Sequence, residues 1–361
     1  MAEPTLSPQR FAELMDRFPQ SQVAVIGDFF LDEYLILDKT LTEISLETDL
    51  EAYQVTATRK NPGVAGTVTN VLRSLDVPVI AIGFSGDDGH GYELRRGLKE
   101  LGINLDHFGI FADRFTPTYT KPMLLENGRE IEQSRLDTKN RLPLTAAHEK
   151  QLIESLRAVV PQANAILAID QAKGRNCGVI TDAVRAELAA LAEEYPEKIL
   201  MADSRDYMSL YRNMIVKFNV SEACNMFGIL PSAHSPELVA SLSRQLFTRY
   251  QKPILLTLGA DGMQVTDRAG SVHIPGIPVS GPTDIVGAGD TVLASAGAAL
   301  SVGATLIEAA MIGNITASIT IQQIGTTGIA TRQQVKERFG KTGEWLNAAI
   351  HSSASQSLEN S

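Results

Sequence analysis

The feature of this sequence that most constrains the fold is a regular alternation of apolar runs with segments of helical spacing between residues 145 and 258. The apolar runs are as short as buried strands, and the segments between them place apolar residues every three or four positions. Strands that alternate with helices in this way form a parallel sheet with helices on both faces. We therefore predict strands over residues 165–169, 198–202, 214–218 and 253–258, and helices over 146–159, 179–194, 221–227 and 236–250.

The first part of the chain is richer in strands. A short apolar run over residues 22–26 predicts a buried strand, and the alternation over 51–58 predicts another. Two further runs, 119–125 and 129–135, flank Asn127-Gly128, which is a strong signal for a β-hairpin. We expect these strands to project from the main sheet.

The overall composition excludes several classes of protein. The chain has 361 residues, 44% of them hydrophobic, and a formal net charge of −10. Such an acidic chain argues against binding along a nucleic-acid backbone, which requires a basic surface. The sequence shows no apolar run of membrane-spanning length and no secretion signal, and Cys177 and Cys224 are too few for a disulfide framework. We expect a cytoplasmic protein that binds neither nucleic acid nor membrane.

The motif that carries most of the chemistry is Gly287-Ala288-Gly289-Asp290, which precedes a run of small residues over 291–302. The run predicts a closely packed helix, and the glycines would then lie at its N-terminus. Unpaired amides and the helix dipole favour an anion such as a phosphate there. Asp290 could take a proton from an attacking hydroxyl. Taken alone, the motif favours the alternative, a tight loop with a capping Asp.

A second motif, Asn219-Val220-Ser221-Glu222, follows the predicted strand 214–218. Loops at the carboxyl ends of parallel strands face the ligand crevice. Glu222 could therefore hold Mg²⁺ through water, and Asn219 could bind a phosphate or a metal-bound water. The alternative is a helix start in which Ser221 is the cap and Glu222 offsets the dipole.

Two more loops follow predicted strands. Asp28 and Asp32 follow the first strand, where carboxylates can accept hydrogen bonds from sugar hydroxyls or serve as turn and cap residues. Thr257, Gly259 and Gly262 follow a later strand, where the glycines either allow close approach of a nucleotide or form a hairpin turn.

Other nucleotide motifs are absent. Gly340-Lys341-Thr342 lacks the first Gly of a P-loop, since Val335 is at that position. Gly27 lacks the partner glycines of a dinucleotide fingerprint, so a nicotinamide-dependent dehydrogenase is a remote alternative.

In this order, the motifs resemble those of the ribokinase-like (PfkB) carbohydrate kinase family. That family has an early Gly-rich sugar loop, an Asn-x-x-Glu loop, a Thr-x-Gly-x-x-Gly stretch and a terminal Gly-Ala-Gly-Asp preceded by an Asp. The resemblance extends from about residue 22 to 350. The matching stretches here are Pro62-Gly63, Asn219 to Glu222, Thr257 to Gly262, Asp284 and Gly287 to Asp290.

Within this family the chain is similar to the bacterial D-glycero-β-D-manno-heptose-7-phosphate kinases. It lacks the His-x-Gly-His motif of their nucleotidyltransferase domain, so we expect a kinase domain only. The similarity lies in Gly27-Asp28-x-x-Leu31-Asp32-x-Tyr34, Ile44 to Glu47, Arg135 to Asp137, Ala172 to Gly174 and Gly325-Thr326.

The chain departs from the pattern mainly on the sugar side. Val64 replaces the second Gly of the sugar loop, and Thr67 takes the position of its Asn. Gln171 replaces an aromatic residue, and Asp203-Ser204-Arg205 stands where the compared heptose kinases have Asp-Pro-Lys. The acceptor therefore stays open between heptose 7-phosphate, another sugar and a nucleoside, and a sugar-binding homologue without turnover is a further alternative.

The resemblance implies an α/β fold with a central, mostly parallel sheet flanked by helices and a small β-sheet lid. The kinase domain would span residues 1–350, with lid segments at about 32–55 and 117–135 and a disordered tail over 351–361. Lids of this family often pair across a homodimer.

The resemblance also implies a set of site residues for an ATP-dependent sugar kinase. Asp290 would be the catalytic base at the end of the motif that begins with Gly287, and the amides of Ala288, Gly289 and Asp290 would stabilise charge on the transferred phosphoryl group. Mg²⁺ would lie near Glu222 and Asn219, and K⁺ or another monovalent cation near Asp284 and the Val286 carbonyl. The nucleotide would also contact Thr257, Gly259, Gly262 and Asn314. The sugar would contact Asp28, Asp32, Gly63, Thr67, Arg135 and Lys173.

Overall fold

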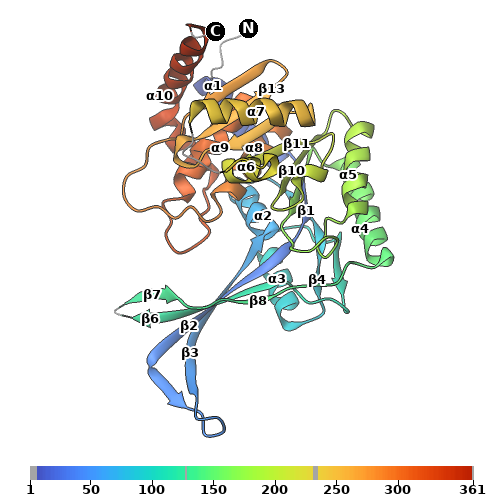
Figure 1. Ribbon diagram of the computed structural model, residues 1–361, viewed down its shortest axis with the longest axis vertical. Coiled ribbons are helices and arrows are strands. Elements are labelled where there is room, and N and C mark those ends of the chain that lie inside the picture. Colours follow the sequence, from blue (N-terminus) through green and yellow to red (C-terminus); the bar gives the residue numbers. More distant parts are fainter. Residues whose placement is uncertain (1–5, 127, 231–234, 360–361) are drawn as a thin grey trace.

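The computed structural model describes residues 6–126, 128–230 and 235–359. It contains one nine-stranded sheet and one five-stranded sheet. Helices surround the larger sheet, and the smaller sheet projects from one end of this body (Figure 1). The predicted α/β class, with a central sheet flanked by helices and a small β-sheet lid, is therefore confirmed.

The larger sheet is parallel except at one edge, where β13 and β14 run antiparallel. The predicted parallel strands of the alternating region are all present. Across the sheet the strands are β14 (Gly270–Ile274), β13 (Met263–Asp267), β12 (Ile254–Thr257), β11 (Ile215–Asn219), β10 (Ile199–Ser204), β9 (Ala165–Asp170), β1 (Val23–Gly27), β4 (Val79–Gly86) and β5 (Phe108–Phe111).

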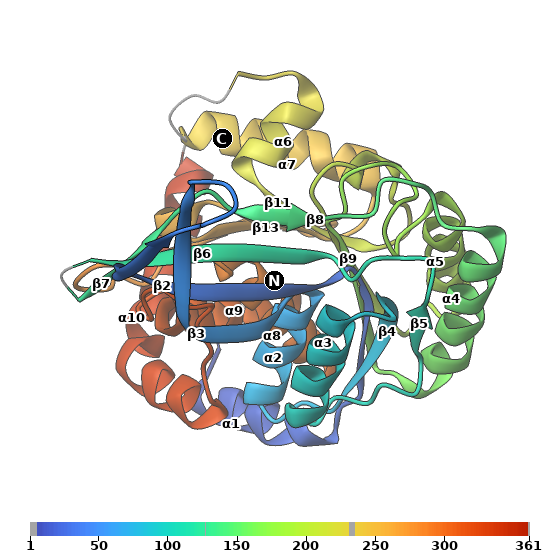
Figure 2. The same cartoon turned by 90° about the horizontal axis from the view of Figure 1, so that it is seen from below.

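Each face of this sheet packs into its own hydrophobic core. Along β1, Val23 and Val25 point into one core, while Ala24 and Ile26 point into the other, because successive side chains of a strand alternate. Figure 2 shows the two groups of helices on opposite sides of the sheet. One core is covered by α1 (Pro8–Arg17), α2 (Ala65–Ser74), α3 (Gly89–Glu100), α8 (Ala288–Ser301), α9 (Leu306–Thr320) and α10 (Arg332–Glu359). The other is covered by α4 (Ala146–Val159), α5 (Asp182–Glu194), α6 (Val220–Phe227) and α7 (Pro236–Tyr250).

The smaller sheet forms the lid. Its strands β2 and β3 pair antiparallel, and β6 pairs parallel to β2. The hairpin predicted between residues 119 and 135 is present as β6 and β7, although Asn127 lies outside the described residues. The lid strands are β2 (Phe29–Ile44), β3 (Glu51–Val64), β6 (Thr118–Glu126), β7 (Arg129–Glu132) and β8 (Leu136–Thr138).

Some boundaries differ from the sequence-based expectation. Helix α5 begins at Asp182 because Thr181 caps it, and β3 continues to Val64 rather than ending near residue 58. Helix α10 continues to Glu359, past the end expected at residue 350, since no Gly or Pro follows to stop it. Residues 360–361 of the expected tail lie outside the described residues.

The small residues of α8 set its position. Thr291 to Leu300 are all buried, and a Cβ on Gly297 would lie 2.7 Å from the Leu167 side chain on β9. The helix therefore packs closely on the sheet, as its composition predicts. Over the described ranges, no helix is long and apolar enough to cross a membrane.

Candidate active site

A glycine is required where α8 begins. Gly287 has a φ of 79°, and its carbonyl accepts a 2.9 Å hydrogen bond from the Thr291 amide. A Cβ at this position would lie 2.6 Å from the Thr327 side chain. Both the left-handed backbone and the close neighbour therefore favour glycine.

The amides that follow form the proposed anion site. The Ala288 N–H, one of those expected to bind phosphate, donates to the Ile285 carbonyl at 3.1 Å. The N–H groups of Gly289 and Asp290 have no hydrogen-bond partner among the described residues. These two amides lie at the positive end of the helix dipole, where a phosphate oxygen can accept from both.

Asp290 lies in a charged environment that favours its protonated form. Burial raises the pKa of Asp290 to about 7, and the charge of Asp203 adds to the rise. Lys217 and Arg205 oppose it, and Asp32 from the lid contributes a smaller increase. A carboxylate whose pKa lies near neutral pH is suited to act as a general base.

The charges that act on Asp290 include a buried ion pair, whose two side chains lie on neighbouring strands. Because Ala202 pairs with Val216 in parallel register, the next residues, Asp203 and Lys217, lie side by side. Their side-chain atoms are 3.0 Å apart, and both residues are buried. Burial is the largest influence on Lys217 and lowers its pKa, but the charges of Asp203, Glu222 and Asp290 and the hydrogen bond to Asp203 together raise the pKa above its usual value.

This pair also reaches the start of α8. The Lys217 ammonium lies 3.5 Å from the position that a Cβ of Gly289 would take. Neither Lys217 nor Asp203 was predicted from the sequence to be a site residue. The signal was a single Lys inside the apolar strand 214–218, which becomes informative only when the strand is known to be central, because buried lysines are nearly always paired.

The Asn-x-x-Glu loop forms a capping box at the start of α6. The Asn219 side chain accepts from the Glu222 amide, and Glu222 accepts from the Asn219 amide, both at 2.8 Å. The cap is therefore Asn219 and not Ser221, as the alternative interpretation assumed. Burial raises the pKa of Glu222, while the charge of Lys217 opposes the rise.

The expected nucleotide stretch lies next to this loop. Thr257 pairs with Asn219 at the carboxyl end of β12, and its hydroxyl donates to the Phe218 carbonyl at 3.2 Å. Gly259 has open space where a Cβ would be. At Gly262 a Cβ would lie 2.2 Å from the Ile274 carbonyl, so this glycine allows the turn into β13.

Asn314 supports the edge of this region from α9. Its buried amide donates to the carbonyls of Ile274 at 3.2 Å and Pro275 at 3.0 Å. The amide nitrogen thus holds the chain that follows β14. Contact between Asn314 and adenine stays a prediction.

At the predicted site for a monovalent cation, the Asp284 carboxylate accepts hydrogen bonds from two loops. One carboxylate oxygen accepts from the Val286 amide and the other from the Gly325 amide, both at 3.0 Å. Asp284 thereby joins the loop before α8 to the loop after α9. Binding of a monovalent cation by Asp284 and the Val286 carbonyl stays a prediction.

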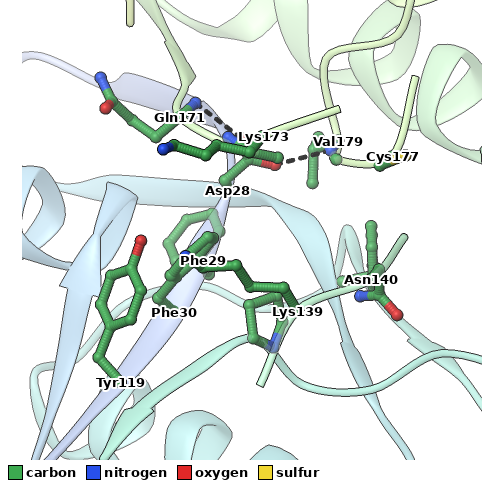
Figure 3. Close-up of a pocket in the computed structure, with 14 residues that line it drawn as sticks. Asp28, Phe29, Phe30, Tyr119, Lys139, Asn140, Gln171, Lys173, Cys177 and Val179 are labelled. Atoms are coloured by element: carbon green, nitrogen blue, oxygen red, sulfur yellow. Dashed lines mark hydrogen bonds between the residues drawn. The ribbon is translucent and has the colours of Figure 1, made fainter. Parts of the chain in front are cut away.

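On the sugar side, Asp28 is fully engaged by main-chain groups. Its carboxylate accepts from the amides of Gln171 at 2.8 Å, Ala172 at 2.7 Å and Val179 at 2.8 Å. Figure 3 shows this carboxylate in the wall of a pocket that Lys173 and Tyr119 also line. In this arrangement Asp28 holds the loop that carries Lys173.

Of the two basic residues predicted for the sugar, Lys173 lines this pocket, whereas Arg135 is not among its lining residues. Lys173 is exposed. Arg135 forms two hydrogen bonds to Asp137, at 2.6 and 3.0 Å, and its guanidinium lies 4.1 Å from the centre of the Tyr119 ring. Arg135 is thus held in the lid by its own neighbours.

The remaining sugar-side residues lie between the lid and α8. Asp32 forms a 3.2 Å ion pair with Lys121, and its carboxylate fills the space beside Gly63. The Thr67 methyl is 3.7 Å from the position of a Gly287 Cβ. Asp32, Gly63 and Thr67 are therefore brought toward the start of α8, whereas Arg135 and Lys173 are not in contact with it.

Val64 has a backbone conformation that favours glycine. Its φ is 59° and its ψ is −112°, at the junction of β3 and α2. A β-branched residue with positive φ is strained, typically by about 1–3 kcal/mol. The turn at this position is thus one that a glycine would adopt without strain.

A family model for the pfkB family carbohydrate kinases matches residues 20–332. The chain belongs to this family. Together with the ribokinase-like fold, this makes the protein a sugar kinase, a phosphotransferase with an alcohol group as acceptor. The motifs on which the sequence-based resemblance rested, from Pro62-Gly63 to Asp290, all lie inside the matched range.

Curated relatives include two bifunctional HldE proteins. That of Pelobacter propionicus is 30% identical over 320 residues, which cover 88% of this chain and 63% of the relative. That of Geobacter metallireducens is 30% identical over 313 residues, covering 86% and 61%. The chain thus spans less than two thirds of the length of these relatives.

Solved structures show the same fold at lower identity. Arabidopsis thaliana ribokinase, complexed with ribose and ATP, has a TM-score of 0.68 and 17% identity, covering 88% of this chain and 98% of its own. Phosphofructokinase-2 from Escherichia coli, in complex with potassium, has a TM-score of 0.70 and 17% identity, covering 92% and 99%. These similarities establish the ribokinase-like fold.

Proposed function

We propose that this sugar kinase transfers the γ-phosphoryl group of ATP to the 1-hydroxyl of heptose 7-phosphate. The acceptor is supported by the 30% identity to HldE proteins and by the motifs shared with heptose-7-phosphate kinases. The observation that carries the reaction is the position of Asp290 beside two unpaired amides and the buried Asp203–Lys217 pair.

In the proposed reaction, the acceptor oxygen bonds to the γ-phosphorus as the bond to the bridging oxygen of ADP breaks. Asp290 takes the proton that the hydroxyl loses. The amides of Gly289 and Asp290 donate to the phosphoryl oxygens, and Lys217 adds positive charge nearby. Positioning and electrostatic stabilisation of this kind supply most of the catalysis in phosphoryl transfer.

The charge balance of the site fits a divalent cation. Asp203, Glu222 and Asp290 provide three carboxylates, which Lys217 and Arg205 only partly offset. The described residues contain no cluster of three or more side chains placed to hold a metal. We propose that Glu222 and Asn219 hold Mg²⁺ through water, and that the metal neutralises charge on the phosphates when bound. K⁺ would be held by Asp284 and the Val286 carbonyl.

A substrate panel tests this function. ADP release is measured with heptose 7-phosphate, fructose 6-phosphate, ribose and a nucleoside, each with and without Mg²⁺ and K⁺. The proposal predicts Mg²⁺-dependent turnover that is fastest with heptose 7-phosphate. Faster turnover with another acceptor would contradict heptose 7-phosphate as the substrate but would still support phosphoryl transfer from ATP. Acceptor binding without ADP release would favour a sugar-binding homologue, for which the changed Val64 and Thr67 are the motivation.

We further propose a cytoplasmic homodimer that forms through the lid. The tip of the β2–β3 hairpin exposes apolar side chains, with Leu46 fully exposed and Leu50 and Ile44 exposed by 68% and 59%. Exposed apolar groups gathered at one place favour association. Sedimentation should show a dimer for the natural chain and a monomer for Leu46→Asp/Leu50→Asp. A natural chain that sediments as a monomer would contradict this.

A further inference from the structure

Arg205 lies at the carboxyl end of the central strand β10, on the side of the sheet where the phosphoryl group would be transferred. It follows Asp203 by two residues and comes directly after β10, which ends at Ser204, while Asn219 is the last residue of the neighbouring strand β11. Asn219 in turn pairs with Thr257 of the nucleotide stretch. Arg205 is exposed, and no described residue pairs with its guanidinium.

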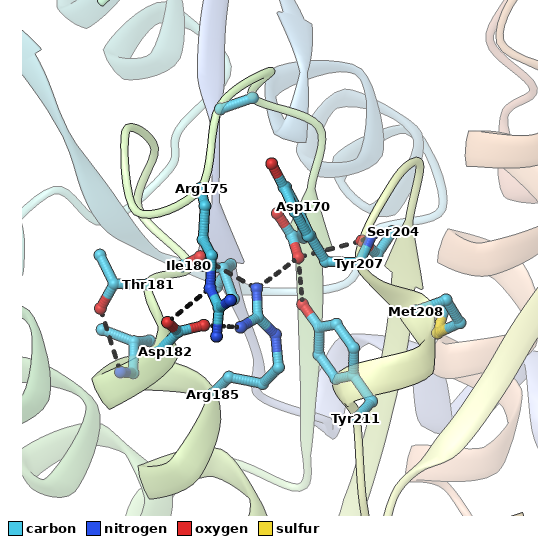
Figure 4. Close-up of polar contacts among 12 residues, drawn as sticks. Asp170, Arg175, Ile180, Thr181, Asp182, Arg185, Ser204, Tyr207, Met208 and Tyr211 are labelled. Carbon is cyan, nitrogen blue, oxygen red and sulfur yellow. Dashed lines mark hydrogen bonds and ion pairs between the residues drawn. The ribbon is translucent and has the colours of Figure 1, made fainter. Parts of the chain in front are cut away.

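The loop that carries Arg205 is held by a buried carboxylate outside the reaction site. Asp170, at the end of β9, accepts hydrogen bonds on one oxygen from Arg185 at 3.1 Å, Ser204 at 3.0 Å and Tyr211 at 3.1 Å (Figure 4). Burial and the charge of Asp28 raise the pKa of Asp170 to about 6, so it is ionised at neutral pH and retains these donors. Arg185 supplies the compensating charge.

Main-chain contacts extend this hold to Arg205 itself. The Arg205 amide donates to the Asp170 carbonyl at 3.1 Å. The Ser204 hydroxyl, while donating to Asp170, also accepts from the Tyr207 amide at 3.1 Å. The backbone on both sides of Arg205 is therefore fixed, while its side chain is left free.

We propose that Arg205 is a catalytic residue that donates hydrogen bonds to the transferring γ-phosphoryl group, and that Asp170 and Ser204 position it. This rests on the proposed kinase reaction. A guanidinium offers several donors in a fixed plane and matches phosphoryl oxygens well. Arg205 neither gains nor loses a proton, because the hydroxyl proton goes to Asp290 and ADP leaves with the bridging oxygen.

A binding measurement tests the contact without an acceptor. Calorimetry with Mg²⁺ compares a non-hydrolysable ATP analogue with ADP for the natural chain, Arg205→Gln and the exposed control Arg268→Gln. Arg205→Gln should weaken binding of the analogue by about tenfold, the lower end for a charge-assisted hydrogen bond, and leave ADP unchanged. Equal losses for both nucleotides, or none, would overturn the proposal. Failure of the natural chain to bind ATP would instead overturn the kinase function.

Turnover provides the second readout. Arg205→Ala should lower kcat about 10²–10³-fold with little change in the KM of the acceptor, and added guanidinium should restore part of the lost rate. Arg205→Lys should fall between the natural chain and Arg205→Ala. A raised acceptor KM with unchanged kcat would place Arg205 on the acceptor instead and contradict the proposal.

The positioning role is tested by a double-mutant cycle. Ser204→Ala removes one donor to Asp170 and leaves the other two, so we expect the fold to persist. It should lower kcat when Arg205 is present but have no further effect in the Arg205→Ala background, because coupled residues are not additive. Additive losses would assign Ser204 a structural role only. Thermal unfolding of both variants separates loss of stability from loss of positioning.

Discussion

The main sheet buries the charged pair Lys217–Asp203 at the carboxyl ends of two neighbouring strands, whereas the lid exposes the pair Arg59–Glu130. The side chains of Lys217 and Asp203 are 4% and 6% exposed. Those of Arg59 and Glu130, which pair between β3 and β7, are 44% and 29% exposed. Both pairs have hydrogen-bonding geometry, so the difference lies in the surroundings.

This difference determines which substitutions the two pairs tolerate. A buried ion pair leaves few acceptable substitutions, because an unpaired buried charge is costly. The exposed pair Arg59–Glu130 contributes about 0–1 kcal/mol, so its residues can change with little effect on the fold. The departures at Val64 and Thr67 have another origin, because Val64 joins β3 to α2 and Thr67 is buried in α2.

The largest expected effect concerns the base. Asp290→Asn keeps the shape of the side chain but cannot take the hydroxyl proton, so kcat should fall by roughly 10²–10⁴-fold. ADP release under saturating substrate measures it. The lid variant Arg59→Met is the matched control and should keep its kcat. Near-normal turnover by Asp290→Asn would place the base elsewhere.

The buried and exposed pairs can be compared directly by unfolding. Lys217→Met leaves Asp203 buried without its partner and should cost about 3–5 kcal/mol, whereas Arg59→Met should cost about 1 kcal/mol or less. Denaturant titrations give both values. The double variant Asp203→Leu/Lys217→Met should recover much of the loss, because no buried charge is then left unpaired. Equal costs at the two pairs would remove the proposed contrast.

Replacing Asp290 with a neutral residue should increase the free energy of unfolding at alkaline pH. Its pKa is about 7 when folded and near 3.8 when unfolded, so the folded state holds its proton more tightly and loses stability as pH rises from 4 to 7. Asp290→Asn should therefore raise the free energy of unfolding by about 1–3 kcal/mol at pH 8, and by almost nothing at pH 4. The same gain at pH 4 and pH 8 would show that the raised pKa of Asp290 is not its cause.

The smallest effect is expected at Val64. Val64→Gly relieves the strained backbone but loses side-chain packing and adds freedom to the unfolded chain, so the net change should stay within about 1 kcal/mol. Val55→Gly, on the same strand but without positive φ, gains no relief and should cost about 1 kcal/mol more than Val64→Gly. Unfolding midpoints compare the two. An equal cost would indicate that Val64 stores no strain.

Much of the fold was predictable from local patterns. The small residues after Gly287 predict a closely packed helix, and the alternating region predicts the parallel strands. The sequence also indicated that the loop from Asn219 to Glu222 could start a helix, but it assigned the cap to Ser221, whereas the structure shows a capping box with Asn219 as the cap. The metal role of Glu222 stays a proposal.

Features that depend on distant parts of the chain could not be predicted. The Asp203–Lys217 pair requires the register between β10 and β11, which no local pattern specifies. The three amides that engage Asp28 come from a loop more than 140 residues later. The positive φ of Val64 is likewise invisible in a residue type that normally avoids it.

The central claim is that Asp290 is the base and that its buried neighbours hold its pKa near neutrality. The most direct test is the pH dependence of kcat/KM for the natural chain and for Asp290→Asn. The account predicts that activity of the natural chain falls about tenfold per pH unit below about pH 7, and that this acid limb is absent from the residual activity of the variant. The same limb in both proteins would contradict it.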